Sequence, residues 1–270
     1  MFRISLHGSS FVGSRFGYQP SGSWEQCVEA LTAYYQPIET FLQRFDALLD
    51  QVQRMGFQRM DVWQPAVLNW QWATSRHIED ARSIIENRGM EITSLAGEFG
   101  VSRAEFDSAC RLAHAIGTPL LSGTTALLSG DRSFVIETLK RYDLRLAIEN
   151  EVETAPAQIL EQIGENSSGW LGAAVDTGWW ATHNYDVVQA LHELKGFVFH
   201  VHLKDVLPGP EHINCGYGKG CVPIADCVRA LIATGYSGVV SLENHSLDHD
   251  PTSELIEGKR MLEELMASTG

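Results

Sequence analysis

Short apolar runs alternate with longer amphipathic segments along most of this chain. The runs predict strands at residues 3–7, 58–63, 91–97, 118–123, 145–150, 172–177, 197–203 and 238–244. Most of them are continuously apolar instead of alternating between apolar and polar residues. This pattern is typical of strands in a parallel sheet that is covered on both faces.

The segments between these runs carry the start and stop signals of helices. Segment 102–117 opens with the Ser-x-x-Glu spacing of a capping box and closes on a glycine. The longest segment, 30–55, is expected to break at Pro37. Asp250 followed by Pro251 is typical of a helix N-cap with proline in the first turn.

Eight predicted strands, each followed by a predicted helix, favour one closed barrel. A single (β/α)8 TIM barrel, spanning residues 1–270 as one domain, is the expected fold. The alternative is an open doubly wound sheet, which usually places a GxGxxG turn after its first strand. Residues 7–17, HGSSFVGSRFG, contain no such motif.

Charge narrows the set of expected partners. The 270 residues carry a formal net charge of −14, and the densest basic stretch is only Lys140, Arg141 and Arg145. Such a chain repels phosphate backbones and anionic membrane surfaces, so neither nucleic acid nor membrane is expected as a partner. A small-molecule substrate is expected instead, and a homo-oligomer stays open because nothing in the sequence marks an interface.

The sequence also carries information on the compartment. No apolar run approaches the ~18 residues of a membrane span, and residues 1–6 do not read as a signal peptide. The five cysteines are odd in number and form no CxxC pair. We therefore interpret them as reduced thiols and expect a cytoplasmic protein.

Four of the predicted strands end in residues that can bind a metal ion. Glu149, Asp176, His202 and Glu243 lie late in, or just after, the last four strands. In a parallel barrel these strand ends meet at one mouth, where active sites are built. Three carboxylates at one mouth repel one another unless a cation neutralises them. Because the set is rich in oxygen, it suits Mn²⁺, Mg²⁺ or Co²⁺, and Zn²⁺ is also compatible.

Each of these residues also has an ordinary structural interpretation. Asp176 could cap a helix, Glu149 could pair with a lysine, and His202 could be a hydrogen-bonded core histidine. Four such residues at matching positions of successive strands are harder to explain in this way. The set as a whole favours one divalent metal site.

Four runs resemble the xylose isomerase-like sugar phosphate isomerase/epimerase superfamily: LAIENE (146–151), AAVDTGWW (173–180), HVHLKD (200–205) and VVSLENH (239–245). The resemblance implies a barrel whose metal is bound by Glu149, Asp176, His202 and Glu243. In the epimerases of that superfamily the two glutamates also act as acid and base. Glu149 and Glu243 would inherit that catalytic role.

Two features depart from the epimerase pattern. Trp179 stands three residues after Asp176, where the epimerases usually have a histidine, and His183 is a candidate replacement. The run HLKD (202–205) looks more like the dehydratase branch of the superfamily. These differences leave the metal ligands in place and leave the reaction open.

Further residues are expected at the mouth as substrate contacts: His7, Glu98, Trp179, His183 and Lys204. Lys204 could stabilise an oxyanion or simply pair with Asp205. The glycine-rich loop 214–220, with Lys219, could bind phosphate or close over the substrate. Tryptophans that follow strands could face the apolar side of a sugar or pack loops on the barrel.

These observations predict a metal-dependent isomerase or epimerase that acts on a small sugar or polyol ketone through an enediolate. A dehydratase similar to inosose dehydratase is the alternative on the same site. A non-catalytic sugar-binding barrel and an AP endonuclease rank lower, the latter because of the acidic charge. A dinucleotide-dependent oxidoreductase would need the phosphate motif that is absent here.

Overall fold

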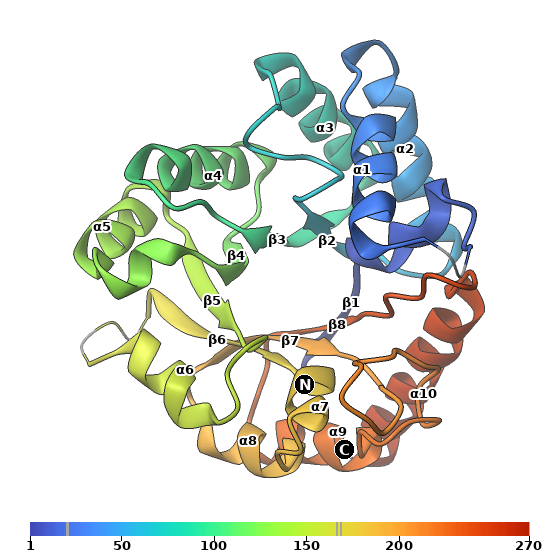
Figure 1. Cartoon of the computed structure of the whole chain (residues 1–270), viewed down its shortest axis with the longest axis vertical. Helices are drawn as coiled ribbons and strands as arrows, with labels where there is room; N and C mark the ends of the chain where they lie inside the picture. Colours follow the sequence, from blue (N-terminus) through green and yellow to red (C-terminus); the bar gives the residue numbers. More distant parts are fainter. Residues whose placement is uncertain (20–21, 166, 168, 270) are drawn as a thin grey trace.

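A closed barrel of eight parallel strands forms the centre of the protein. The computed structural model describes residues 1–19, 22–165, 167 and 169–269. The strands pair in chain order, β8 closes on β1, and helices surround them (Figure 1). This confirms the predicted (β/α)8 TIM barrel. The strands are β1 (Arg3–His7), β2 (Arg59–Trp63), β3 (Glu91–Glu98), β4 (Leu120–Thr124), β5 (Arg145–Glu149), β6 (Leu171–Asp176), β7 (Val198–Leu203) and β8 (Val239–Leu242).

The helices lie in the segments between these strands. Two are short 3-10 helices, η1 (Gly8–Arg15) and η2 (Ala126–Ser129). The α-helices are α1 (Trp24–Tyr35), α2 (Ile38–Arg54), α3 (Ser75–Arg88), α4 (Arg103–Ile116), α5 (Arg132–Tyr142), α6 (Pro156–Ile163), α7 (Thr177–Thr182), α8 (Val187–Glu193), α9 (Ile224–Ala233) and α10 (Thr252–Thr269).

The local signals in the sequence act as expected. Ser102 caps α4, and Glu105 completes the capping box. The long segment that contains Pro37 breaks there, because α1 ends at Tyr35 and Pro37 is the N-cap of α2. Helix α1 begins at Trp24, earlier than the apolar pattern indicated, because Ser23 and Gln26 form a capping box before it.

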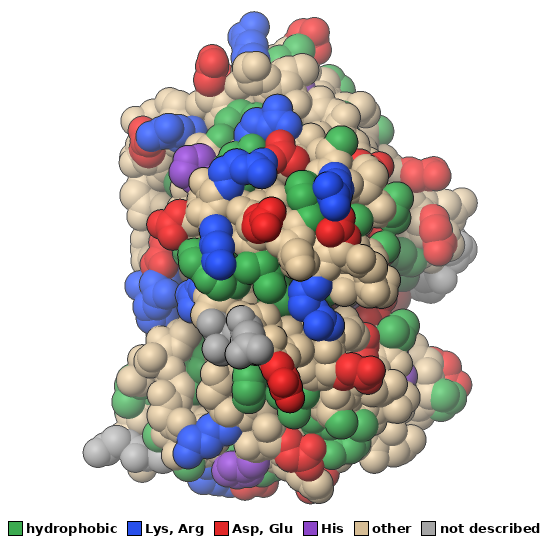
Figure 2. Space-filling view, turned by 90° about the vertical axis from the view of Figure 1, so that its left-hand side faces the viewer, with side chains coloured by type: hydrophobic (Ala, Val, Ile, Leu, Met, Phe, Trp, Pro, Cys, Tyr) green, Lys and Arg blue, Asp and Glu red, His purple; other side chains and the backbone are tan. Residues whose placement is uncertain are grey.

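Charges of both signs cover the face that Figure 2 shows, where Lys and Arg side chains are interspersed with Asp and Glu. The basic stretch of the sequence is partly neutralised, because Arg141 pairs with Asp107 at 2.8 Å. In the described part of the chain, no helix combines the length and the apolar content needed to cross a bilayer.

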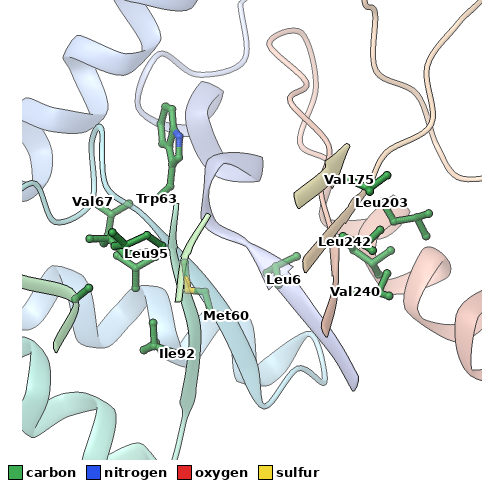
Figure 3. Close-up of a cluster of buried hydrophobic side chains, with 14 of the residues drawn as sticks. Leu6, Met60, Trp63, Val67, Ile92, Leu95, Val175, Leu203, Val240 and Leu242 are labelled. Atoms are coloured by element: carbon green, nitrogen blue, oxygen red, sulfur yellow. The ribbon is translucent and has the colours of Figure 1, made fainter. Parts of the chain in front are cut away.

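Away from the register shifts between β2 and β3 and between β6 and β7, successive side chains of the strands face alternately outward and inward. The outward positions are aliphatic, and Figure 3 shows Val175, Leu203, Val240 and Leu242 from neighbouring strands packed together. Since side chains alternate along a strand, the residues next to these point into the barrel. That second set includes His200 and His202 of β7, and it determines what lines the interior.

Part of the interior of the barrel below its mouth is polar, whereas Leu120, Ala147 and Ala174 form a small apolar cluster. Asp61 is completely buried, and its carboxylate accepts hydrogen bonds from Thr93 and Ser241 and lies 2.9 Å from His200 Nε2. Ser5 bonds Thr93 at 2.9 Å. Aliphatic residues usually fill this space in such barrels. Here a hydrogen-bonded layer forms the floor on which the site rests.

Candidate metal centre

The inward positions at the carboxyl ends of β5 to β8 bring the four predicted metal ligands together. Glu149, Asp176 and His202 end or nearly end their strands, and Glu243 directly follows β8. One ligand atom from each of the four residues lies within 4.8 Å of the others. Of the four, Glu149 is the most accessible, with a side chain that is 20% exposed. The cluster therefore has the chemistry and the spacing to hold a divalent cation.

His202 lies between the two glutamates. Its Nδ1 atom is 2.7 Å from Glu149 Oε1 and 3.4 Å from Glu243 Oε2. Its other ring nitrogen, Nε2, lies 3.1 Å from the Ser122 hydroxyl. Since Ser122 orients one edge of the ring, the opposite edge with Nδ1 is presented to the carboxylates.

Asp176 has two roles at once. Its Oδ1 atom accepts hydrogen bonds from the backbone N–H groups of Gly178 and Trp179 at 2.8 and 3.0 Å, which makes it the N-cap of α7. Capping α7 through one carboxylate oxygen is thus compatible with binding a metal ion through the other. The cap fixes Oδ1 and leaves Oδ2 directed toward the cluster, where Lys204 Nζ lies 2.7 Å away.

Lys204 is a buried cation inside the cluster. Its side chain is 2% exposed, and its Nζ atom lies 3.5 Å from Glu243 Oε1 in addition to its contact with Asp176. It does not pair with Asp205, which the sequence had left open. Asp205 instead accepts hydrogen bonds from three backbone N–H groups of its own loop. Lys204 thus belongs to the centre itself.

A second group of side chains holds Glu243. Ser9 of η1 donates a hydrogen bond to Glu243 Oε1 at 2.8 Å, His7 Nδ1 lies 3.1 Å from the same oxygen, and His245 Nε2 also contacts it. The other oxygen, Oε2, is buried and has no hydrogen-bond partner. Neither Ser9 nor His245 was predicted at the site from the sequence. The run ENH at 243–245 was the available signal, because side chains two residues apart face the same side of an extended segment.

The protonation states reflect this crowding of charges. Burial works against a charged His202, but the carboxylates of Glu149 and Glu243 raise its pKa to about 10. Burial alone would raise the pKa of Glu149 and Glu243, yet neighbouring cationic groups lower both, through His202 for Glu149 and through His7 and Lys204 for Glu243. Burial dominates for Asp176 and raises its pKa. Without a metal, protons and Lys204 have to balance the carboxylates.

The donor set fits a divalent metal ion. Glu243 Oε2 is a buried oxygen without a hydrogen bond, and it faces Nδ1 of His202 inside the cluster. Buried acceptors are normally satisfied, so an exception marks a place for a ligand or an ion. Three carboxylates with one imidazole are hard, oxygen-rich donors of the kind that bind Mn²⁺ or Mg²⁺.

A cavity of about 1410 Å³ opens above the cluster. Among the expected substrate contacts, His7, Glu98, Trp179 and Lys204 line it, together with Glu149 and Glu243. His183 is not in this lining. Its imidazole instead donates to the Glu151 carbonyl oxygen at 3.0 Å.

Trp179 lies between two histidine rings. It stacks on His183 at 5.8 Å between ring centroids and on His212 at 3.7 Å, with an interplanar angle of 11° to the latter. His212 lines the cavity and is held by the Thr182 hydroxyl at 2.8 Å. Burial lowers the pKa of His212 to about 3, so its ring is neutral. His212 was not predicted at this site, because it lies 36 positions from Asp176 along the chain.

The fold and the centre define a class: a parallel barrel with a carboxylate–histidine cluster at its mouth that could hold a divalent cation. Residues 49–265 match the sequence model of the family described as "Xylose isomerase-like TIM barrel". The chain belongs to this family. Among curated proteins, none matches the chain in sequence.

Solved structures show the same fold at low sequence identity. A D-tagatose 3-epimerase-like protein is 15% identical with a TM-score of 0.71, and the match covers 99% of this chain and 98% of that one. An L-ribulose 3-epimerase is 17% identical with a TM-score of 0.71, over 100% and 96% of the two chains. The IOLI protein with a bound zinc atom is 12% identical with a TM-score of 0.70, over 100% and 99%.

Proposed function

We propose that this protein is a metal-dependent isomerase or epimerase of a small polyhydroxylated ketone, with Glu149 and Glu243 as its acid and base. One observation carries the proposal. The two glutamates meet at the same edge of His202 in one cavity, with Nδ1 of that ring 2.7 Å from one carboxylate and 3.4 Å from the other. Paired carboxylates around a substrate site are the groups that proton transfer at carbon requires.

The position of the glutamates around the barrel supports the assignment of one as the acid and the other as the base. Glu149 ends β5 and Glu243 follows β8, so they are the first and the last of the four ligand positions around the rim. A substrate bound between them presents opposite faces to the two carboxylates. One carboxylate removes the proton from the carbon next to the carbonyl, and the other delivers a proton to the opposite face.

The residues around the glutamates prepare them for this chemistry. Ser9, His7 and His245 fix Glu243 Oε1, so that its rotamer is set before substrate arrives. A divalent ion held by Glu149, Asp176, His202 and Glu243 would supply Lewis-acid polarisation of the substrate carbonyl. The Lys204 ammonium adds a fixed positive charge that favours developing negative charge on substrate oxygen.

Solvent exchange tests this proposal. Candidate ketoses are incubated with manganese-loaded protein in D₂O, and deuterium incorporation at carbon is followed by NMR. Glu149→Gln and Glu243→Gln should each lower the exchange rate by about 10²-fold or more. Glu137→Gln on the exposed side of α5 is the matched control and should have no effect. Metal content and circular dichroism are measured for each variant, and full exchange in either active-site variant refutes the acid/base assignment.

A dehydratase on the same centre is the second candidate, and Lys204 favours it. Its ammonium group lies between Asp176 and Glu243, where it can protonate a hydroxyl group that leaves from the carbon β to a carbonyl. The exchange experiment distinguishes the two reactions. An isomerase or epimerase returns a product of unchanged composition, whereas a dehydratase gives a product that is lighter by one water. Binding without exchange or product would point to a sugar-binding barrel.

A further inference from the structure

The cavity is divided into a metal-binding part and an aromatic part. The candidate metal ligands come from β5 to β8. On the side of β1 to β3 the lining includes Trp24 of α1, Trp63 at the end of β2 and Trp70 in the following loop. Trp63 stands above the aliphatic residues Met60 and Leu95 in Figure 3, directed away from them. The aromatic part therefore lies on the β1 to β3 side of the mouth, and Trp24 adjoins the metal-binding part, because its ring lies 4.9 Å from that of His245, which contacts Glu243.

The volume of the cavity exceeds what one sugar ring needs. Pockets that bury drug-sized ligands enclose about 300–1,000 Å³, and a single sugar ring is smaller than such ligands. This cavity encloses about 1410 Å³. A monosaccharide on the metal ligands would leave much of this volume, including the space beside the tryptophans, unfilled.

The charges of the lining argue against a phosphorylated or otherwise anionic substrate. Eight glutamates and aspartates line the cavity but only two lysines, and among the described residues no arginine does. One of the lysines, Lys204, is already paired with Asp176 and Glu243. Phosphate is normally held by arginine, by lysine or by free backbone N–H groups. The second lysine, Lys219, is then the one lysine or arginine left for it in the described lining.

Several backbone N–H groups of the glycine-rich loop after β7 are already bonded within the protein. Its backbone N–H groups at Gly218 and Gly220 donate to Asp205 Oδ2 at 2.8 and 3.0 Å, and that of Val222 donates to Asp205 Oδ1 at 3.1 Å. A carboxylate of the protein itself thus occupies the place that an anion would take. These N–H groups are not available to a phosphate, and the sequence-based expectation that the loop binds phosphate stays a prediction that rests on Lys219.

We infer that the substrate is an uncharged glycoside of two rings, one held at the metal ligands and the second stacked on Trp24, Trp63 and Trp70. The flat, apolar faces of a sugar ring pack on indole, and a neutral ring carries no charge to be repelled by the acidic lining. Trp70 is well placed to act as a platform, because its Nε1 donates to the Glu98 carbonyl oxygen at 3.3 Å. This inference rests on the proposed function for the identity of the first ring.

Calorimetric titration of the manganese-loaded full chain tests the inference. The probes are D-fructose, D-fructose 6-phosphate and a panel of neutral disaccharides that covers α and β linkages. At least one disaccharide should bind tenfold or more tightly than fructose, and the phosphate should bind no more tightly than fructose. A tightest ligand that is phosphorylated, or disaccharides that bind no better than fructose, would overturn the inference.

Substitutions of Trp70 test whether the second sugar ring stacks on the tryptophans. Trp70→Ala should weaken disaccharide binding at least tenfold and change fructose binding less than twofold, whereas Trp70→Phe should retain part of the affinity. Trp170→Ala is the matched control, because Trp170 is half-buried, precedes β6 and lies outside the cavity lining. An unchanged disaccharide affinity in Trp70→Ala refutes the proposed stacking.

Deuterium exchange on the same samples separates this inference from the proposed function. If fructose exchanges its carbon-bound proton with solvent but no disaccharide binds more tightly than fructose, the two-ring inference fails and the acid/base function stands. If disaccharides bind preferentially but no probe exchanges a proton, the acid/base function fails and the two-ring site stands.

Discussion

Replacement of Lys204 by methionine should destabilise the metal-free protein strongly. The Lys204 side chain is 2% exposed, with Nζ 2.7 Å from Asp176 Oδ2 and 3.5 Å from Glu243 Oε1. Methionine keeps the unbranched aliphatic shape and removes the charge. Breaking a buried ion pair by removing one partner costs about 3–5 kcal/mol, because the remaining charge is left buried and unpaired. We expect the free energy of unfolding in EDTA to fall by this amount.

A divalent cation should recover much of that loss. Lys204 and the cation compete electrostatically for the same carboxylates, so the variant should bind Mn²⁺ more tightly than the wild type. At a free Mn²⁺ concentration of 1,000 times the dissociation constant, binding adds about 4 kcal/mol to the free energy of unfolding. The stabilisation by Mn²⁺ should accordingly be larger in Lys204→Met than in the wild type.

Urea denaturation followed by circular dichroism and tryptophan fluorescence measures both effects, with EDTA and with Mn²⁺. Lys140→Met is the matched control, because Lys140 is exposed on α5, where substitutions change stability by about 0.5 kcal/mol or less. The reasoning is refuted if Lys204→Met in EDTA matches the wild type within that margin. It is also refuted if Mn²⁺ stabilises both proteins equally.

Two further predictions concern protons and packing. In the metal-free protein the pKa of His202 is raised to about 10 from 6.5. The protonated ring therefore stabilises the folded state fully below pH 6.5, and this contribution is lost as pH rises toward 10. Metal binding at pH 7.5 should therefore release about one proton, measurable by calorimetry in buffers of different ionisation enthalpy, and no release would contradict the ligand role. Gly123→Ala should cost more than about 2 kcal/mol in urea denaturation, because φ is +145° and a Cβ would lie 1.9 Å from the Gly97 carbonyl oxygen. Gly130→Ala, with nothing within 4 Å, is its control and should change stability much less.

The strands and their order were predictable because apolar runs and capping residues are local signals. Each predicted strand overlaps an observed one, and the break at Pro37 follows from the missing N–H group of proline. The start of α1 at Trp24 was less clear, because its first turns bury few residues and apolar periodicity weakens there. Helix α10 begins at Thr252, directly after the predicted Asp250–Pro251 start.

The candidate ligands were predictable for a geometrical reason, and their surroundings were not. Parallel strands of a barrel end at one mouth, so residues at matching strand ends meet even when they are far apart in sequence. Glu149 and Glu243 are 94 positions apart and belong to one cluster. Ser9, by contrast, reaches the centre from η1, and no periodicity indicates where the side chains of an irregular segment point. Lys204 was predicted at the mouth, but that it pairs with Asp176 and not with the adjacent Asp205 depends on the path of the loop.

A count of the charges in the centre explains why a divalent ion neutralises it better than a monovalent ion does. Glu149, Asp176 and Glu243 carry three negative charges when ionised, and Lys204 supplies one positive charge. A doubly charged ion completes the balance with a neutral His202, which can then donate an electron pair. Without the ion, His202 has to take up a proton and the pKa of Asp176 rises, so the protein replaces the missing charge with protons. A monovalent ion would leave one buried negative charge unbalanced, and the buried position of the cluster makes that imbalance costly.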